Sequence, residues 1–368
     1  MEIFKELIVV ELASVLAGPA VGLFFAELGA KVIKVENKTT NGDVTRNWKL
    51  PNEPTNSSIS SYYCSVNWNK ETLLLDLSQD TDKQQVINII KDADIVVSNF
   101  KKESATQLGM DYEQLSALNE KLIYAQLNSY HEQDNTPAFD VVLQAETGFL
   151  YMNGEPERPP VKMPVALIDI LAAHQLKEGI LCALWQRERT QKGAYIHVSL
   201  FDSAVASLAN QATNWLMCNH IPQRMGALHP NIAPYGDTFY TADNQAIVLA
   251  VGTEKQFVIL CKCLDIDDIS NNTLYNTNAQ RVKNRTALNE ILTDAFLKLK
   301  KSDILPLLKA KGVPCGSINN LKDVFEIPQA QSLILEDTLP DGRIGKRVKT
   351  VVFSIENTRK TGIVPPQP

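Results

Sequence analysis

The chain has 368 residues, which is enough for two domains with a large buried core. Hydrophobic residues make up 44% of it and charged residues 21%, as in a typical globular protein, and the net charge of −6 argues against nucleic acid or an anionic membrane surface as a partner. The longest apolar run near the N-terminus, residues 12–26, is shorter than the roughly 18 residues that a membrane span requires. Because residues 1–6 also lack the features of a targeting signal, we expect a cytoplasmic location and no membrane contact.

The first half of the chain alternates predicted strands and helices. Residues 7–12 form a continuous apolar run, typical of a strand covered on both faces, and Gly18-Pro19 then opens a helix that ends at Gly29. Further elements are predicted as strands at residues 31–36, 72–77, 94–97 and 122–127, and as a helix around residues 86–90. Such a series predicts an α/β domain with a Rossmann-like, doubly wound parallel sheet, whose ligands lie at the carboxyl ends of the strands.

An apolar segment turns into a helix at Asp169. Apolar residues follow at helical spacing, and this helix is predicted to stop near Lys192-Gly193. Residues 196–200 alternate as in a strand, and Asp202-Ser203 is predicted to cap a further helix over residues 203–218. From the residues alone, the favoured role of Asp169 is that of a helix N-cap, because Asp is among the best capping residues.

The pattern of the chain changes after about residue 219. A loop rich in turn-forming residues, 229–236, is followed by predicted strands and helices at residues 246–251, 254–264, 284–299, 301–310 and 313–318. We therefore predict a large domain over residues 1–205 and a smaller α+β domain over residues 225–330. Residues 335–368 are expected to return to the large domain.

The six cysteines form no recognisable framework. They are Cys64, Cys182, Cys218, Cys261, Cys263 and Cys315. Only Cys261 and Cys263 are close in sequence, and no Cys or His pair at zinc-site spacing accompanies them. We therefore expect free thiols in a reducing compartment and no bound metal.

A doubly wound start raises the question of a nucleotide cofactor. Gly18 and Gly22 do not make the G-x-G-x-x-G pattern of dinucleotide sites, because Pro19 occupies the turn, and no G-x-x-x-x-G-K-[ST] loop exists. These absences disfavour a nicotinamide-dependent dehydrogenase.

Several short motifs, spread over nearly the whole chain in one order, carry a resemblance to a known family. They are residues 10–12, 17–19, 28–36, 42–46, 69–70, 75–77, 94–100, 108–110, 139–140, 144–145, 312–316 and 327–330. In these the chain resembles the class III CoA-transferases, which include formyl-CoA and carnitine CoA-transferases and the α-methylacyl-CoA racemases. The resemblance implies coenzyme A and acyl-CoA as substrates with a small carboxylic acid, no tightly bound cofactor, and an interlocked homodimer.

In that family, the residue at the position of Asp169 is the nucleophile. An aspartate is already ionised at pH 7, so it attacks a thioester carbonyl without an adjacent base. The resemblance implies an acyl-aspartyl mixed anhydride and a bound CoA thiolate, followed by exchange of a second acid into the anhydride and recapture by CoA. The amide groups at the start of the helix are expected to keep Asp169 anionic.

The resemblance also implies which residues contact CoA. They are Leu16, Ala17, Asn37, Leu75, Asp76, Leu77, Ser78, Asn99, Phe100, Lys101, Gln107 and Phe139. Asn37 and Gln107 stand where the family often has arginines, so Lys101 becomes the best remaining partner for the CoA phosphates, unless it is a solvated surface lysine. Arg46 and Lys70 could compensate or could equally be surface charges.

Asp140 stands where related transferases have an acidic residue near the nucleophile, and its structural alternative is a loop cap. A racemase of the same family commonly has a His immediately before that acid, where this chain has Phe139, which cannot move a proton. The residues therefore favour CoA transfer over racemisation. A non-catalytic CoA-binding protein is the alternative from another class, and the sequence names neither the donor nor the acceptor.

Overall fold

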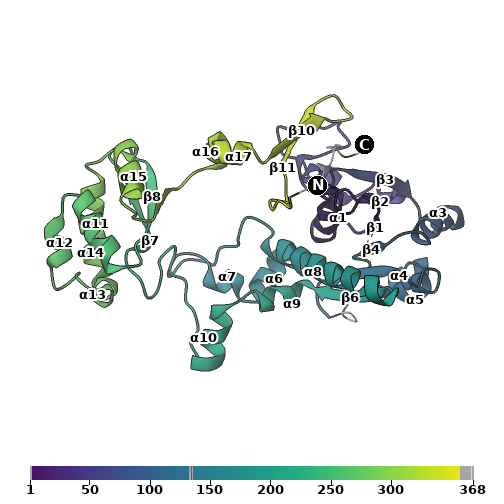
Figure 1. Cartoon of the computed structure of the whole chain (residues 1–368), viewed down its shortest axis with the longest axis horizontal. Coiled ribbons are helices and arrows are strands. Elements are labelled where there is room, and N and C mark those ends of the chain that lie inside the picture. Colours follow the sequence, from purple (N-terminus) through teal and green to yellow (C-terminus); the bar gives the residue numbers. More distant parts are fainter. Residues whose placement is uncertain (1, 132–133, 135, 357–365, 367–368) are drawn as a thin grey trace. The chain divides into compact units, whose positions relative to one another are not determined.

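In the computed structural model, described for residues 2–131, 134, 136–356 and 366, the chain divides into two compact units (Figure 1). The first comprises Met1–Phe149, Met163–His220 and Gln329–Pro368, and the second comprises Leu150–Lys162 and Ile221–Pro328. The short segment at residues 150–162, which the sequence analysis placed in the large domain, thus groups with the second unit. Of the C-terminal segment predicted to return, residues 357–365, 367 and 368 lie outside the described residues.

A six-stranded parallel sheet forms the centre of the first unit. Its strands are β1 (Ile8–Leu12), β2 (Lys31–Asn37), β3 (Lys70–Leu75), β4 (Ile95–Ser98), β5 (Ile123–Asn128) and β6 (Ala194–Ser199). They lie in the order β3-β2-β1-β4-β5-β6, which confirms the predicted doubly wound sheet. The order reverses between β1 and β4, where the connections of such sheets leave a crevice at the carboxyl ends of the strands.

Buried apolar side chains cover both faces of this sheet. Val9 and Ile95 contribute to a core with α1 (Ala17–Glu27) and α8 (Leu167–Thr190), whereas the adjacent Val10 contributes to a core with α3 (Asp80–Ile90). Further helices of this unit include α2 (Ser61–Cys64), α4 (Lys102–Leu108), α5 (Tyr112–Ser116), α6 (Asp140–Glu146), α9 (Leu200–Ala206) and α10 (Asn210–Cys218). Burial on both faces explains why these strands read as continuous apolar runs.

Several predicted element ends were wrong. The third strand ends at Leu75, and the helix predicted over residues 203–218 is divided into α9 and α10 at Ala209, whose φ of 50° lies in the left-handed region. The cap of α9 is Ser199, whose hydroxyl accepts a hydrogen bond from the Asp202 N–H at 2.9 Å. Asp202 and Ser203 are therefore residues inside the first turn.

The end of α8 also differs from the prediction. The helix stops at Thr190, and Gln191 takes the left-handed conformation that a glycine often supplies. Gly193 serves another purpose, because a Cβ there would lie 2.0 Å from the carbonyl oxygen of Leu122. It allows the start of β6 to lie against the start of β5.

The second unit holds an antiparallel sheet in the order β7-β8-β9, with strands β7 (Tyr235–Tyr240), β8 (Ala246–Ala250) and β9 (Cys315–Ser317). Its helices include α11 (Glu254–Cys263), α12 (Asp267–Asn271), α13 (Asn278–Lys283), α14 (Arg285–Phe296) and α15 (Lys301–Ala310). The first strand was not predicted, because Gly236 and Asp237 interrupt its pattern. A hairpin of β10 (Ile334–Thr338) and β11 (Ile344–Val348) belongs to the first unit. None of the described helices is both long and apolar enough to cross a membrane.

Candidate active site

A larger and a smaller cavity at the carboxyl edge of the parallel sheet contain predicted site residues, and the larger has a volume of about 710 Å³. Loops after β1, β2, β3 and β4 form its walls. The predicted CoA contacts on these walls are Asn37, Leu75, Asp76, Leu77, Ser78 and Phe100. These residues come from separate parts of the sequence, and the parallel sheet brings them to one edge.

The smaller cavity, of about 230 Å³, contains Asp169 in its wall. The predicted residues that line it with Asp169 are Leu16, Ala17, Asn99, Lys101 and Phe139. Ser14, in the loop between β1 and α1 (residues 13–16), lines both cavities. This loop is therefore part of the walls of both spaces.

The structure shows where the residues considered for binding the CoA phosphates lie. Lys101 lines the smaller cavity rather than the larger one, and Gln107 is exposed and lines neither of them. Arg46 is buried against Glu36, with its Nε 2.7 Å from Oε2, and the Lys70 ammonium is fully buried. Neither Arg46 nor Lys70 is therefore a surface charge, because both are held in ion pairs inside the protein.

Asp169 is the third residue of α8 and not its N-cap, which is Ala166. Asp169 is half-buried, and no residue in the described part of the chain donates a hydrogen bond to its side chain. Burial, and next the negative charge of Asp140, raises the pKa of Asp169 to about 7. The helix amides were expected to keep this carboxylate anionic, but they do not hold its pKa at or below the usual value.

Asp140, the first residue of α6, supplies the missing cap. Its Oδ2 accepts a hydrogen bond from the Ile168 N–H at 2.7 Å, and its Oδ1 accepts one from Gln144 Nε2 at 2.5 Å. It therefore satisfies one of the free amides at the start of α8 from a neighbouring helix. The capping role and the role near the nucleophile are compatible, because Asp140 caps α8 and its negative charge also raises the pKa of Asp169.

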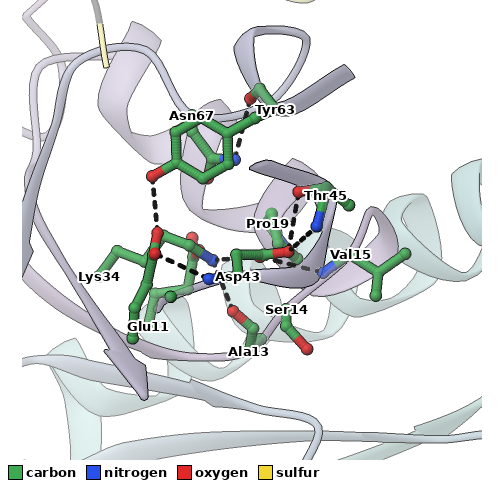
Figure 2. A network of polar contacts seen from close by, with 12 residues as sticks. Glu11, Ala13, Ser14, Val15, Pro19, Lys34, Asp43, Thr45, Tyr63 and Asn67 are labelled. Atoms are coloured by element: carbon green, nitrogen blue, oxygen red, sulfur yellow. Dashed lines mark hydrogen bonds and ion pairs between the residues drawn. The ribbon is translucent and has the colours of Figure 1, made fainter. Parts of the chain in front are cut away.

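A group of buried charged residues lies next to the loop that joins β1 to α1 (Figure 2). Glu11 binds both Lys34, at 2.9 Å, and Lys70, at 2.7 Å, and all three side chains are fully buried. Lys34 also pairs with Asp43 at 3.1 Å. Burial lowers the pKa of Lys70 to about 8, an effect that Glu11 opposes. Sequence reasoning missed this network, although Glu11 and Lys34 within apolar strands were a signal that could have revealed it.

The chemistry available in the site is that of carboxylates. Among the described residues, no group of three or more His, Cys, Asp or Glu side chains is arranged to hold a metal ion. Phe139 is 63% exposed and offers no proton to exchange. The smaller cavity presents the carboxyl group of Asp169, whose pKa is raised to about 7, and that of Asp134.

Comparisons with known proteins identify the family. The model of CoA-transferase family III matches residues 4–368. The chain is 36% identical to the succinate–glutarate CoA-transferase of Agrobacterium fabrum, covering 94% of this chain and 88% of that protein. It is 32% identical to the succinyl-CoA:glutarate CoA-transferase of Homo sapiens, covering 95% and 81%. 

A crystal structure of a CAIB/BAIF family protein from Brucella suis has the same fold, with a TM-score of 0.87 and 34% identity over 99% of this chain and 95% of that one. Each of these similarities extends over nearly the whole length, as the resemblance in the sequence implied. The chain therefore belongs to CoA-transferase family III and is an enzyme of that family.

Proposed function

We propose that this enzyme moves CoA from an acyl-CoA to a free carboxylic acid through a mixed anhydride on Asp169. The observation that carries the proposal is the place of Asp169 in the smaller cavity, beside the cavity lined by the predicted CoA-contacting loops. Ser14 lines both spaces, which supports a CoA chain running along the β1–α1 loop with its thioester toward Asp169. Phe139, which cannot exchange a proton, supports transfer over racemisation.

The reaction proceeds in balanced steps. The Asp169 carboxylate attacks the thioester carbonyl, the C–S bond breaks, and CoA leaves as a thiolate. The acceptor carboxylate then attacks the aspartyl carbonyl of the anhydride, and the donor acid leaves as a carboxylate. The thiolate finally attacks the acceptor acyl group, which forms the new thioester and releases Asp169 as a carboxylate. Contacts of CoA with the protein offset the higher energy of the anhydride.

Short dicarboxylic acids are the proposed substrates, because the names of both relatives specify succinate or succinyl-CoA with glutarate. Incubation of the full chain with succinyl-CoA and glutarate is expected to yield glutaryl-CoA and free succinate, detected by mass spectrometry. Valerate, which matches glutarate in length but has one carboxylate, is the control acceptor and should react more slowly. Hydrolysis of succinyl-CoA without exchange into any acid would contradict the proposal.

The pH dependence should reveal the pKa of the nucleophile. Because the pKa of Asp169 is about 7, its nucleophilic form is lost below that pH, and kcat/KM is expected to rise with pH and level off above about 7. Asp140→Asn removes the neighbouring charge that raises this pKa, so the acidic limb should move to lower pH. The asparagine oxygen can still accept from the Ile168 N–H, so the cap of α8 is retained.

Asp202→Asn is the matched control for this profile, since Asp202 is an exposed first-turn carboxylate of α9 that does not line either cavity. Its acidic limb should coincide with that of the wild type. If the acidic limb of the kcat/KM profile of Asp140→Asn lies at the same pH as that of the wild type, the assignment of this limb to Asp169 is contradicted.

We further propose an interlocked homodimer in the cytoplasm. The family resemblance implies the dimer, and α10 supports it by exposing Trp215, Leu216 and Met217. All six cysteines are free, which fits a reducing compartment. Light scattering is expected to give about twice the chain mass, with no monomer on dilution, because interlocked chains separate only on unfolding. A reversible monomer would exclude interlocking.

A further inference from the structure

The loop between β1 and α1 contains a strained residue. Val15 has a φ of 73°, in the left-handed region that branched side chains rarely adopt. It lies between Ser14 and Leu16 in the wall of the cavity that holds Asp169. A conformation of this kind persists only where the surrounding structure imposes it.

Side chains from three other segments hold this loop. The Val15 N–H donates to Asp43 Oδ2 at 3.2 Å, as Figure 2 shows. Lys34 Nζ donates to the Ala13 carbonyl oxygen at 2.7 Å. Asn99 exchanges two hydrogen bonds with the backbone of Ser14, at 3.3 and 3.1 Å. Of these contacts, only the one from Asp43 reaches the strained residue itself.

Asp43 is well suited to fix Val15, because its own position is determined from both sides. Its Oδ1 accepts hydrogen bonds from the Thr45 N–H at 3.0 Å and the Thr45 hydroxyl at 2.8 Å, while Oδ2 faces Val15 and Lys34. Its side chain is fully buried, so both oxygens are occupied by donors of the protein although the residue borders the larger cavity. Burial alone would raise the pKa of Asp43, but Lys34 and the Thr45 hydrogen bonds outweigh it and hold the pKa below its usual value.

We propose that Asp43 is a positioning residue for the transfer reaction: it holds Val15 in the left-handed conformation and so sets where the Ser14–Ala17 loop places the thioester relative to Asp169. The proposal rests on the function proposed above. Attack on a carbonyl requires the reacting atoms to lie about 3–3.5 Å apart, and a displacement of about 1 Å lowers the rate by about 100-fold. A loop that borders both cavities is where such a displacement would have the greatest effect.

Asp43→Asn tests this role. The asparagine offers one acceptor oxygen in place of two, so its amide group must face either Thr45 or the pair of Val15 and Lys34. At pH 8, kcat for succinyl-CoA and glutarate is expected to fall about 30-fold or more, with KM changing by less than about three-fold. Thr45→Val, which removes one hydrogen bond to the other oxygen and leaves Val15 untouched, should lower kcat by less than about three-fold.

Glycine adopts a positive φ without strain, and this provides a rescue experiment. In a Val15→Gly background, Asp43→Asn should lower kcat by only about three-fold, because glycine keeps the loop conformation without the hydrogen bond to Asp43. A loss as large as in the Val15 background would overturn the proposal, as would a wild-type kcat in Asp43→Asn alone. If Asp43→Asn does not fold, Asp43→Glu keeps the charge beside Lys34 and displaces the acceptor, and the same two comparisons apply.

Hydrogen exchange separates this inference from the proposed function. The Val15 amide should be protected in the wild-type protein and exchange about ten-fold faster or more in the Asp43 variant, whether or not the enzyme transfers CoA. Equal exchange in the two proteins would overturn the inference. If the wild type transfers no CoA but its Val15 amide is protected as expected, the proposed function is rejected. The inference that Asp43 holds Val15 in its conformation would still be supported.

Discussion

Asp169→Asn is expected to lower the rate of CoA transfer by about 1,000-fold or more, because the amide cannot attack the thioester and form the anhydride. The same substitution should stabilise the protein at pH 8. The carboxylate of Asp169 is ionised at that pH, although burial and the charge of Asp140 disfavour its ionised form in the folded state. Exchange assays and thermal unfolding at pH 8 measure the two effects.

The sign of the stability effect follows from linkage. The pKa of Asp169 is about 7 in the folded protein and 3.8 as its reference value, so the wild type loses stability as the pH rises between these values. The neutral asparagine has no such dependence. The free energy of unfolding of Asp169→Asn should therefore exceed that of the wild type by about 2 kcal/mol above pH 7, after a discount for partial exposure. Below about pH 4 the two free energies should be equal.

Asp169→Ala distinguishes this account from a capping role. A residue that caps a helix costs about 0.5–2 kcal/mol when replaced by alanine. Because Asp140 caps α8 and Asp169 is inside its first turn, we now expect no loss of that kind, contrary to the expectation from the sequence. A lower melting temperature for both variants at pH 8, or wild-type transfer by Asp169→Asn, would reject the assignment.

Glu11→Gln should produce the largest loss of stability. Glu11 lies between two buried ammonium groups. Its removal leaves Lys34 paired with Asp43, and leaves Lys70 with no carboxylate in an ion pair among the described residues. Breaking one partner of a buried ion pair costs about 3–5 kcal/mol, because an uncompensated charge remains in the interior. Urea unfolding with a constant m-value would measure this loss.

A surface pair provides the control. Glu71 lies 3.5 Å from Lys31, and both side chains are about half exposed, so Glu71→Gln should change the free energy of unfolding by less than about 0.5 kcal/mol. Similar effects of Glu11→Gln and Glu71→Gln would show that the interior tolerates the unpaired lysines.

The parallel sheet could be predicted because its strands are buried on both faces and therefore appear in the sequence as continuous apolar runs. Val9 and Val10 face opposite cores, and a run of apolar residues therefore records a strand covered on both faces. The division of residues 203–218 into two helices could not be predicted in this way. It occurs at Ala209, an alanine with a positive φ, where no glycine or proline marks the change of direction.

The candidate site was only partly accessible from the sequence. Family resemblance singled out Asp169, and the pattern of strands indicated the edge of the sheet at which it lies. The contacts that govern its chemistry join residues far apart in the chain, such as Asp140 with Ile168, and local spacing does not reveal them. Likewise, the sequence suggests Lys70 as a possible phosphate ligand, but in the structure its ammonium binds Glu11, 59 positions away in the chain.

The shared carboxylate of Glu11 has a consequence for how the molecule opens. It binds one lysine from β2 and one from β3, so it joins three adjacent strands through a single buried side chain. Detaching any one of these strands would expose its own backbone and also leave an unbalanced charge in what remains. We therefore expect β1, β2 and β3 to open together as one cooperative unit, so that the buried residues next to the β1–α1 loop keep their positions while the protein is folded.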